Sequence, residues 1–206
     1  MITIILSETR RSIEYINEIE KNKIEINKII LYSKTLGNTY KFIKKKKLTS
    51  ILIHLKTNSI NSKILEKKFE KIKSKTNIVA TYPGEIVKNK SLLKHNLIHC
   101  HPGDLPIFKG STTIYYAIIL KKKICVTLFE LSEKIDDGKI LYKKYFQYPK
   151  NLKLIENNFD NEIRAKTLVE YLKTKKKYYY KETKKKYMHY YIAHPIIRQI
   201  VINKSI

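Results

Sequence analysis

Four short apolar runs, each separated from the next by a longer polar or amphipathic stretch, constrain the fold of this chain most strongly. The runs are rich in Ile, Leu and Val and span four or five residues each: Ile2–Leu6, Ile29–Tyr32, Ile51–Leu55 and Ile78–Thr81. A continuous run of this kind is typical of a strand that is buried on both faces. Segment 58–75 carries apolar residues at helical spacing and predicts an amphipathic helix. Strands that alternate with helices predict an α/β fold, with a Rossmann-like, mostly parallel twisted sheet flanked by helices.

The second half of the chain continues this pattern and then changes character. Strands are predicted at 97–101, 124–131 and 139–146, a helix at 114–120 with Ser111–Thr113 as its cap, and a helix at 160–173. A Lys- and Tyr-rich segment at 175–187 precedes an apolar end at 191–202, which we expect to need a partner surface. We therefore predict a first domain at 1–146 and a C-terminal extension at 147–206.

Length and cysteine content are those of an intracellular globular protein. A chain of 206 residues buries roughly 70% of its unfolded surface on folding, so its core needs no disulfides or structural metals. Cys100 and Cys125 form neither a disulfide framework nor a C-x-x-C motif, which suits a reducing compartment. The apolar start at Ile2–Leu6 is too short for a signal peptide, and no run approaches a membrane span. We expect a soluble, cytoplasmic protein.

The net charge of +25 has two explanations. Such a charge suits binding to nucleic acid or to an anionic membrane. However, the basic residues are 39 lysines and only 4 arginines, whereas base and phosphate recognition favours the bidentate guanidinium group. Lys, Ile, Asn and Tyr share AT-rich codons, so a biased genome produces the same surface. We expect no membrane partner, keep nucleic acid as an unfavoured alternative, and expect the charge to help attract a phosphorylated substrate.

Two histidines and one aspartate mark a candidate site. His99 and His101 are two residues apart at the end of a predicted strand, before Pro102 and Gly103 break the strand. Asp136 lies in a loop between the last two predicted strands. Two His and one Asp suit metal ligation, an acid–base site in which the carboxylate fixes an imidazole tautomer, or a purely structural role. The sequence holds neither G-x-G-x-x-G after the first strand nor a P-loop, which argues against those phosphate cradles.

A turn at 82–87 follows the fourth predicted strand. Its residues Pro83 and Gly84 lie at the carboxyl end of a strand, where open sheets bind ligands. A glycine there permits close approach of the backbone to a flat ligand, although an ordinary turn explains it equally well.

Three motifs together resemble the formyltransferase family, whose members move a formyl group from 10-formyltetrahydrofolate to an amine. They are His101-Pro102-Gly103-Asp104-Leu105-Pro106, Lys109-Gly110, and Ile135-Asp136-Asp137-Gly138-Lys139-Ile140-Leu141, with Asp136 following His101 by 35 residues. The family pattern is Asn-x-His-x-x-x-Leu-Pro, a downstream Gly and an Asp-x-Gly loop. The resemblance is clearest over 78–141 and, through strand order, extends over the first 146 residues.

The resemblance implies a site and a mechanism. His101 matches the catalytic His and Asp136 the catalytic Asp, while His99 stands where the family has a catalytic Asn. In the family the His and Asn donate hydrogen bonds to a tetrahedral oxyanion and the Asp orients and charges the His, without a metal. An imidazole N–H of His99 can replace the amide donor, but loss of one such donor costs on the order of 10²- to 10³-fold in rate.

The resemblance also implies a folate pocket and a class of acceptor. Main-chain groups of the turn at 82–87 and of the loop that carries Asp136 would hold the folate: Tyr82, Pro83, Gly84, Glu85, Ile86, Asp137 and Gly138.

Members that act on methionyl-tRNA add a β-barrel domain, whereas only 60 residues follow Phe146 here. The glycinamide ribonucleotide member usually has a Gly-Ser-Gly loop after its first strand, which this chain lacks. The C-terminal extension is similar to one that amino-sugar formyltransferases use in pairing or substrate contact, so a nucleotide-linked amino sugar is the favoured acceptor and a homodimer is expected. The alternatives are the other two acceptors, a formyltransferase-like module that binds RNA or another polyanion without catalysis, and a His/Asp metal enzyme such as a hydrolase.

Overall fold

The computed structural model describes residues 1–72, 74–174 and 187–203. The chain forms two compact units, Met1–His99 and Cys100–Ile206. The boundary falls inside strand β5 (Leu97–His101), so one strand contributes residues to both units.

The first unit is a parallel sheet. Its strands are β1 (Ile2–Ser7), β2 (Lys28–Tyr32), β3 (Leu52–Leu55), β4 (Thr76–Ala80) and the start of β5. They lie in the order β3-β2-β1-β4-β5, and every one of these neighbouring pairs is parallel. The predicted Rossmann-like parallel sheet is confirmed.

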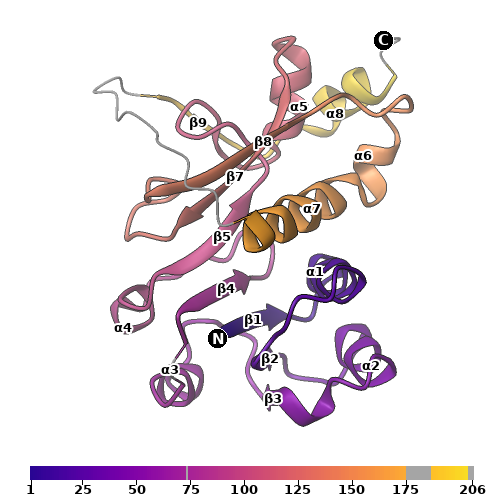
Figure 1. Ribbon diagram of the computed structural model, residues 1–206. Helices are drawn as coiled ribbons and strands as arrows, with labels where there is room; N and C mark the ends of the chain where they lie inside the picture. The colour runs from indigo at the N-terminus through magenta and orange to yellow at the C-terminus, as the bar shows by residue number, and fades with distance from the viewer. Residues whose placement is uncertain (73, 175–186, 204–206) are drawn as a thin grey trace. The chain divides into compact units, whose positions relative to one another are not determined.

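Helices cover both faces of this first sheet. Helices α1 (Arg10–Lys21) and α2 (Asn38–Lys45) pack side by side on one face, whereas α3 (Lys63–Phe69) and the short α4 (Lys90–Leu93) lie on the other, as Figure 1 shows. A single-turn helix, η1 (Thr49–Ile51), precedes β3. The helix predicted over 58–75 is shorter, because residues before Lys63 form turns; Ser62 caps α3 by accepting from Leu65 N.

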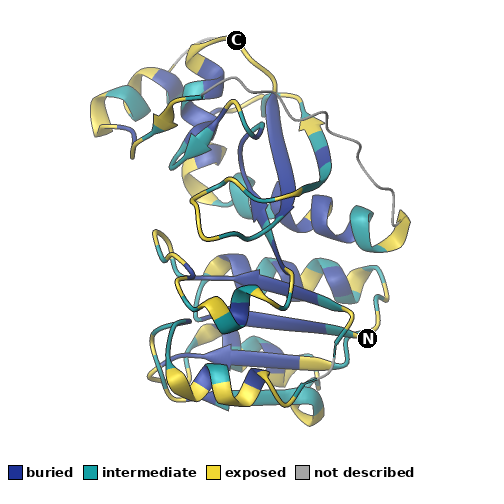
Figure 2. Ribbon diagram, turned by 90° about the vertical axis from the view of Figure 1, so that its left-hand side faces the viewer, coloured by how far each residue is buried: buried dark blue, intermediate teal, exposed yellow. Residues whose placement is uncertain are grey.

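Burial follows the apolar runs that predicted the strands. The central residues of β1, β2 and β4 are fully buried, as the dark-blue strands of Figure 2 show: Ile4, Ile5, Leu6, Ile29, Ile30, Leu31, Ile78 and Val79. Full burial of one such side chain contributes about 1.5–3 kcal/mol relative to exposure. Leu65 and Phe69 of α3 are also fully buried, whereas Ile64 is 57% exposed.

The second unit is mixed in strand direction. It contains the end of β5, β7 (Ile124–Glu130) and β8 (Ile140–Phe146), in the order β5-β7-β8, with β7 and β8 antiparallel. A separate two-stranded pair joins β6 (Lys109–Gly110) to β9 (His189–Tyr190) in parallel. The helices are α5 (Thr113–Ile119), α6 (Leu154–Asn157), α7 (Phe159–Thr174) and α8 (Pro195–Ile202).

Residues beyond 146 pack on the elements of this second unit. Helix α7 lies against β7 and β8, and Arg164 Nη1 donates to Cys100 O of β5 at 3.2 Å. Helix α8 packs on α5 and buries Val201, while Ile196 and Ile200 remain 63% and 62% exposed. The domain boundary at 146 and the homodimer stay predictions, and the Lys- and Tyr-rich segment lies, apart from Tyr187, outside the described residues.

The predicted cap of α5 is wrong in its chemistry. Thr112 is the residue before the helix, but it has a left-handed backbone (φ 52°) and its side chain makes no capping bond. Its hydroxyl instead accepts from Ala193 N at 2.7 Å, so it binds the C-terminal segment.

In the described ranges, no helix is both long enough and apolar enough to cross a membrane.

Candidate active site

His101 lies at the end of β5 with both ring nitrogens facing oxygen atoms of the second unit. Its Nε2 is 2.7 Å from Phe108 O, and its Nδ1 is 3.5 Å from Asp136 Oδ1. The ring is 3% exposed and packs edge-on against Phe129. A carbonyl oxygen can only accept, so the shorter contact assigns the hydrogen of the neutral ring to Nε2.

Some groups around His101 raise the pKa of its ring and others lower it. Burial lowers the pKa of His101 below its ordinary value, while the Asp136 carboxylate and the hydrogen bond to Phe108 O raise it and Arg164 lowers it further. The net direction is downward, so the imidazole is neutral at pH 7. A neutral imidazole beside a carboxylate can accept a proton on Nδ1 and have the new charge stabilised at once, which is what acid–base chemistry needs.

Asp136 is held in a restricted conformation by its neighbours. Its backbone is left-handed (φ 50°), a region that Asp tolerates better than most residues. Gly110 N donates to its Oδ2 at 2.7 Å, which leaves Oδ1 facing His101. The loop can pass close to β7 only because Gly138 has no side chain: a Cβ there would lie 1.6 Å from Glu130 O.

The turn after β5 is fixed by contacts to β7 and α5. Thr127 Oγ1 donates to Gly103 O at 2.6 Å and accepts from Leu105 N, and the Thr113 hydroxyl donates to Pro102 O. A Cβ on Gly103 would lie 2.5 Å from Phe108 O and 2.6 Å from His101 Nε2, so glycine is required for the bond between those two residues.

Asp104, although part of the motif that carried the resemblance, has a structural role. Its carboxylate pairs with Lys143 of β8 at 2.6 Å and accepts from the Tyr145 hydroxyl at 3.2 Å. The contact ties the turn after β5 to the edge of the second unit.

His99 is held by the neighbouring strand within the first unit. Its Nδ1 lies 3.3 Å from Val79 O of β4. Because a carbonyl oxygen only accepts, Nδ1 carries the hydrogen, and Nε2 of the neutral ring is then an acceptor. An asparagine amide donates whatever the pH, whereas His99 donates from Nε2 only when the ring is charged.

The turn at 82–86 in the first unit is organised by the side chain of Glu85. Its two carboxylate oxygens accept from the Tyr32 hydroxyl at 2.6 Å, Ile60 N at 2.6 Å and Tyr82 N at 3.1 Å. Burial raises the pKa of Tyr32, and the Glu85 carboxylate raises it further, so the hydroxyl stays a donor. The ring of Tyr82 meets that of Tyr32 edge-on at 5.5 Å. Glu85 therefore holds the shape of the turn.

The main chain of this turn faces open space at Gly84. Gly84 has φ 75°, and a Cβ there would have no heavy atom within 4 Å. Within the described part of the chain neither its N–H nor its carbonyl has a hydrogen-bond partner. Ile86, 40% exposed, follows it. The turn thus offers main-chain hydrogen bonds and an apolar side chain, which suits a flat, polar-edged ligand.

A cavity of about 290 Å³ opens beside the loop at 132–138, which carries Asp136, in the second unit. Its lining residues are Lys109, Lys134, Ile135, Asp137 and His189. Asp137, predicted to bind the cofactor, pairs with Lys109 there. His189 comes from β9, so the C-terminal segment contributes to the surroundings of the loop.

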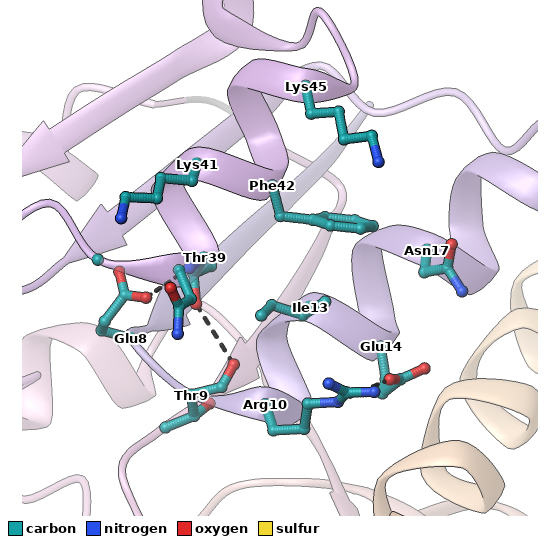
Figure 3. A pocket seen from close by; sticks show the side chains of 12 residues that line it. Glu8, Thr9, Arg10, Ile13, Glu14, Asn17, Thr39, Lys41, Phe42 and Lys45 are labelled. Carbon is teal, nitrogen blue, oxygen red and sulfur yellow. Dashed lines mark hydrogen bonds and ion pairs between the residues drawn. The ribbon is translucent and has the colours of Figure 1, made fainter.

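A larger cavity of about 750 Å³ lies in the first unit between α1 and α2, and none of the predicted site residues lines it (Figure 3). Glu8 Oε1 accepts from Thr39 N at 2.5 Å, and Arg10 pairs with Glu14 at 3.0 Å along α1. The first contact joins the turn after β1 to the start of α2, and the second lies within α1. Over the described ranges, no cluster of three His, Cys, Asp or Glu residues is placed to hold a metal ion.

Three groups that act on the candidate pair escaped the sequence reasoning. They are the Phe108 carbonyl, the Gly110 amide and the β9 strand. Two are main-chain groups without a side-chain signature, and the only signal for the third was a glycine at 110.

Comparison with solved structures identifies the fold. A sugar N-formyltransferase from Shewanella sp. superposes with a TM-score of 0.61 and 19% identity, covering 93% of this chain and 77% of that one. A phosphoribosylglycinamide formyltransferase from Streptococcus pneumoniae gives a TM-score of 0.61 and 17% identity over 84% and 96%. The chain has the formyltransferase fold.

The matches extend across formyltransferases with different acceptors. An N-formyltransferase from Helicobacter canadensis, solved with folinic acid and dTDP-3-aminofucose, gives a TM-score of 0.58 and 14% identity over 92% of this chain and 70% of that one. A methionyl-tRNA formyltransferase is also among the matching structures. No protein-family model matches the sequence, and no curated protein matches it.

Proposed function

We propose that this protein is an N-formyltransferase that moves a formyl group from 10-formyltetrahydrofolate to a primary amine, most favourably that of a nucleotide-linked amino sugar. The observation that carries the proposal is the pairing of His101 with Asp136, within a fold shared with formyltransferases. The pair suits the reaction because an amine that attacks a formyl carbon must lose a proton and the formyl oxygen must gain stabilisation.

His101 and Asp136 divide this work between two atoms of one ring. His101 Nε2–H now donates to Phe108 O, and the same N–H is the donor available to a formyl oxygen when substrate enters. His101 Nδ1 faces Asp136, so the carboxylate stabilises positive charge that develops on the ring. As the bond from the amine to the formyl carbon forms, the bond from that carbon to the tetrahydrofolate nitrogen breaks, and the proton that the amine loses passes to this departing nitrogen. The Gly110 amide keeps the carboxylate in place while this happens.

The folate donor is supported by the turn at 82–86 and by the ligands of matching structures. Among the described residues the main-chain groups of Gly84 have no hydrogen-bond partner, which leaves them available to a pterin ring. The Helicobacter canadensis N-formyltransferase was solved with folinic acid. In this proposal the main chain of Tyr82 to Ile86 contacts the pterin and Glu85 keeps the turn in shape. Asp137 and Gly138 stay predicted cofactor-binding residues.

A nucleotide-linked amino sugar is the favoured acceptor. The same Helicobacter canadensis protein was solved with dTDP-3-aminofucose, and the Shewanella protein is a sugar N-formyltransferase. Lys109 and Lys134 beside the catalytic loop suit the diphosphate of such a substrate. Glycinamide ribonucleotide and methionyl-tRNA are the alternatives, because formyltransferases for those acceptors share the fold.

The test is a formyl-transfer assay with 10-formyltetrahydrofolate and a panel of acceptors. The panel contains amino-sugar nucleotides, glycinamide ribonucleotide and methionyl-tRNA, and formation of the N-formyl product is followed by mass spectrometry. We expect turnover with an amino-sugar nucleotide, unchanged by EDTA. Turnover with one of the other two acceptors would overturn the acceptor but keep the reaction.

Two further outcomes would overturn the reaction itself. Absence of turnover together with absence of reduced-folate binding by calorimetry would do so, and steeply salt-dependent RNA binding in that case would favour the non-catalytic, polyanion-binding alternative. A chelator-sensitive hydrolysis without folate would favour the metal-enzyme alternative.

A further inference from the structure

The C-terminal segment returns to the catalytic region and pairs with it. Strand β9 lies parallel to β6, with Lys109 opposite His189 and Gly110 opposite Tyr190. Ser111 N donates to Tyr190 O at 2.9 Å, and Ala193 N donates to Thr112 Oγ1 at 2.7 Å. Residues 109–112 are therefore held by chain that lies about 80 residues later in the sequence.

Gly110 allows the main chain of the C-terminal segment to approach closely. A Cβ at Gly110 would lie 2.1 Å from Tyr190 O, and its φ of 102° is unfavourable for residues with a side chain. The glycine that belongs to the family-like motif is therefore required here by the approach of Tyr190.

The ring of Tyr190 packs on the residue that holds His101. It stacks on the Phe108 ring with 5.2 Å between centroids and an interplanar angle of 29°, and meets the Tyr116 ring of α5 at 4.8 Å. Phe108 is 3% exposed, and its carbonyl accepts from His101 Nε2 at 2.7 Å. Movement of the Phe108 ring therefore changes the position of the oxygen that orients the imidazole.

The main chain opposite Tyr190 holds the other member of the pair. Gly110 N donates to Asp136 Oδ2 at 2.7 Å, and Asp136 Oδ1 faces His101 Nδ1 at 3.5 Å. Two separate routes thus lead from Tyr190 to the pair, one through Phe108 to His101 and one through Gly110 to Asp136. A single residue that contacts both routes can set the distance between the imidazole and the carboxylate.

We infer that Tyr190 is a positioning residue of the active site, which fixes residues 108–110 so that His101 and Asp136 keep their mutual geometry. The inference rests on the proposed function for its catalytic consequence, but its geometric content stands on the contacts alone. The ring acts through Phe108, whereas Gly110 meets the main chain of Tyr190. The Tyr190 hydroxyl has no hydrogen-bond partner within the described ranges, so Phe can replace Tyr here.

The kinetic test compares Tyr190→Ala with Tyr190→Phe and Tyr191→Ala. Tyr191 is the adjacent tyrosine, 83% exposed, and serves as the matched control for loss of an aromatic side chain. We expect Tyr190→Ala to lower kcat roughly 10- to 100-fold, as small displacements of reacting groups do. The KM for 10-formyltetrahydrofolate should stay within about 2-fold of wild type. Tyr190→Phe and Tyr191→Ala should match the wild type. Should Tyr190→Ala fail to fold, Tyr190→Leu keeps apolar bulk without a stacked ring and takes its place.

The second arm does not depend on turnover. The imidazole signal of His101 is followed by NMR across pH, and identified by its loss in His101→Ala. In the wild type the midpoint should lie below the ordinary His value of about 6.5, because burial lowers the pKa of His101. In Tyr190→Ala it should move toward that value as the ring loses its fixed, buried position, whereas Tyr190→Phe and Tyr191→Ala should not move it.

The two arms separate the inference from the proposed function. A folded Tyr190→Ala with wild-type kcat and an unmoved midpoint overturns the positioning role. If the wild type formylates no acceptor, the proposed function fails, and the NMR arm alone decides whether Tyr190 positions the pair.

Discussion

The turn at 82–86 and the loop at 132–138 both carry a carboxylate at the end of a strand, but the two carboxylates differ in role. In the turn, Glu85 accepts from three donors of its own unit, and its two oxygens are used up in holding the chain. In the loop, Asp136 accepts one main-chain hydrogen bond and turns its other oxygen toward His101. A fully satisfied carboxylate shapes a site, whereas one with an oxygen facing a titratable group can act in it. This contrast predicts separable effects of mutations.

The largest effect should follow removal of the imidazole in the second unit. In the proposed mechanism His101→Ala removes the hydrogen-bond donor to the formyl oxygen and the ring whose charge Asp136 stabilises, so kcat should fall on the order of 10³-fold or more. The control is His54→Gln, which changes a histidine hydrogen-bonded to Ser33 and should retain wild-type turnover. Steady-state kinetics at saturating donor measure both. If His101→Ala kept most of the activity, the site would be assigned to the wrong residue.

Glu85→Gln should affect stability and donor binding while sparing the chemistry. The amide turns an N–H toward a group that itself donates, which leaves a buried donor unpaired and costs about 1–3 kcal/mol. Urea unfolding should report this loss of stability, and calorimetry should report weaker folate binding. We expect kcat at saturating 10-formyltetrahydrofolate to stay within about 2-fold of wild type. The matched control is Glu25→Gln at an exposed position, expected to be neutral. A large fall in kcat without loss of stability would give Glu85 a direct catalytic role and erase the contrast.

The smallest effect concerns His99, the departure from the family pattern. Because Nδ1 of His99 faces Val79 O, the neutral ring has no N–H to offer from Nε2. His99→Asn supplies a donor that does not depend on protonation, and kcat should rise about 10-fold, part of what one oxyanion donor is worth. His99→Ala, which supplies no donor, should show no rise. Equal or lower turnover in His99→Asn would mean that the imidazole serves this site better than the amide.

The first unit followed from the sequence because its elements are defined by local pattern. The β-branched runs predicted β1, β2 and β4 to within two residues. Helix α2 escaped prediction because only Thr39 and Ile43 of its eight residues are buried and lysines dominate the rest. The apolar stripe of such a helix is too narrow to predict the helix from the sequence.

The site followed from the sequence only as far as side chains carry it. His101 and Asp136 were predicted from motif spacing, and the structure brings them within 3.5 Å of each other. The groups that orient them are the Phe108 carbonyl and the Gly110 amide, which every residue possesses and no pattern reveals. The pairing of β6 with β9 joins two-residue strands far apart in sequence, and Thr112 was misread as a helix cap because its hydroxyl binds that same segment. Non-local main-chain contacts are the part of a site that a single sequence leaves out.

The most direct test of the central claim is single-turnover formyl transfer by Asp136→Asn, compared with wild type and with Glu133→Gln, an exposed carboxylate of the same loop. The account predicts that Asp136→Asn lowers the rate about 10²-fold or more, while folate affinity stays within about 2-fold and Glu133→Gln matches the wild type. Transfer by Asp136→Asn at the wild-type rate would contradict the claim that Asp136 and His101 act as a catalytic pair.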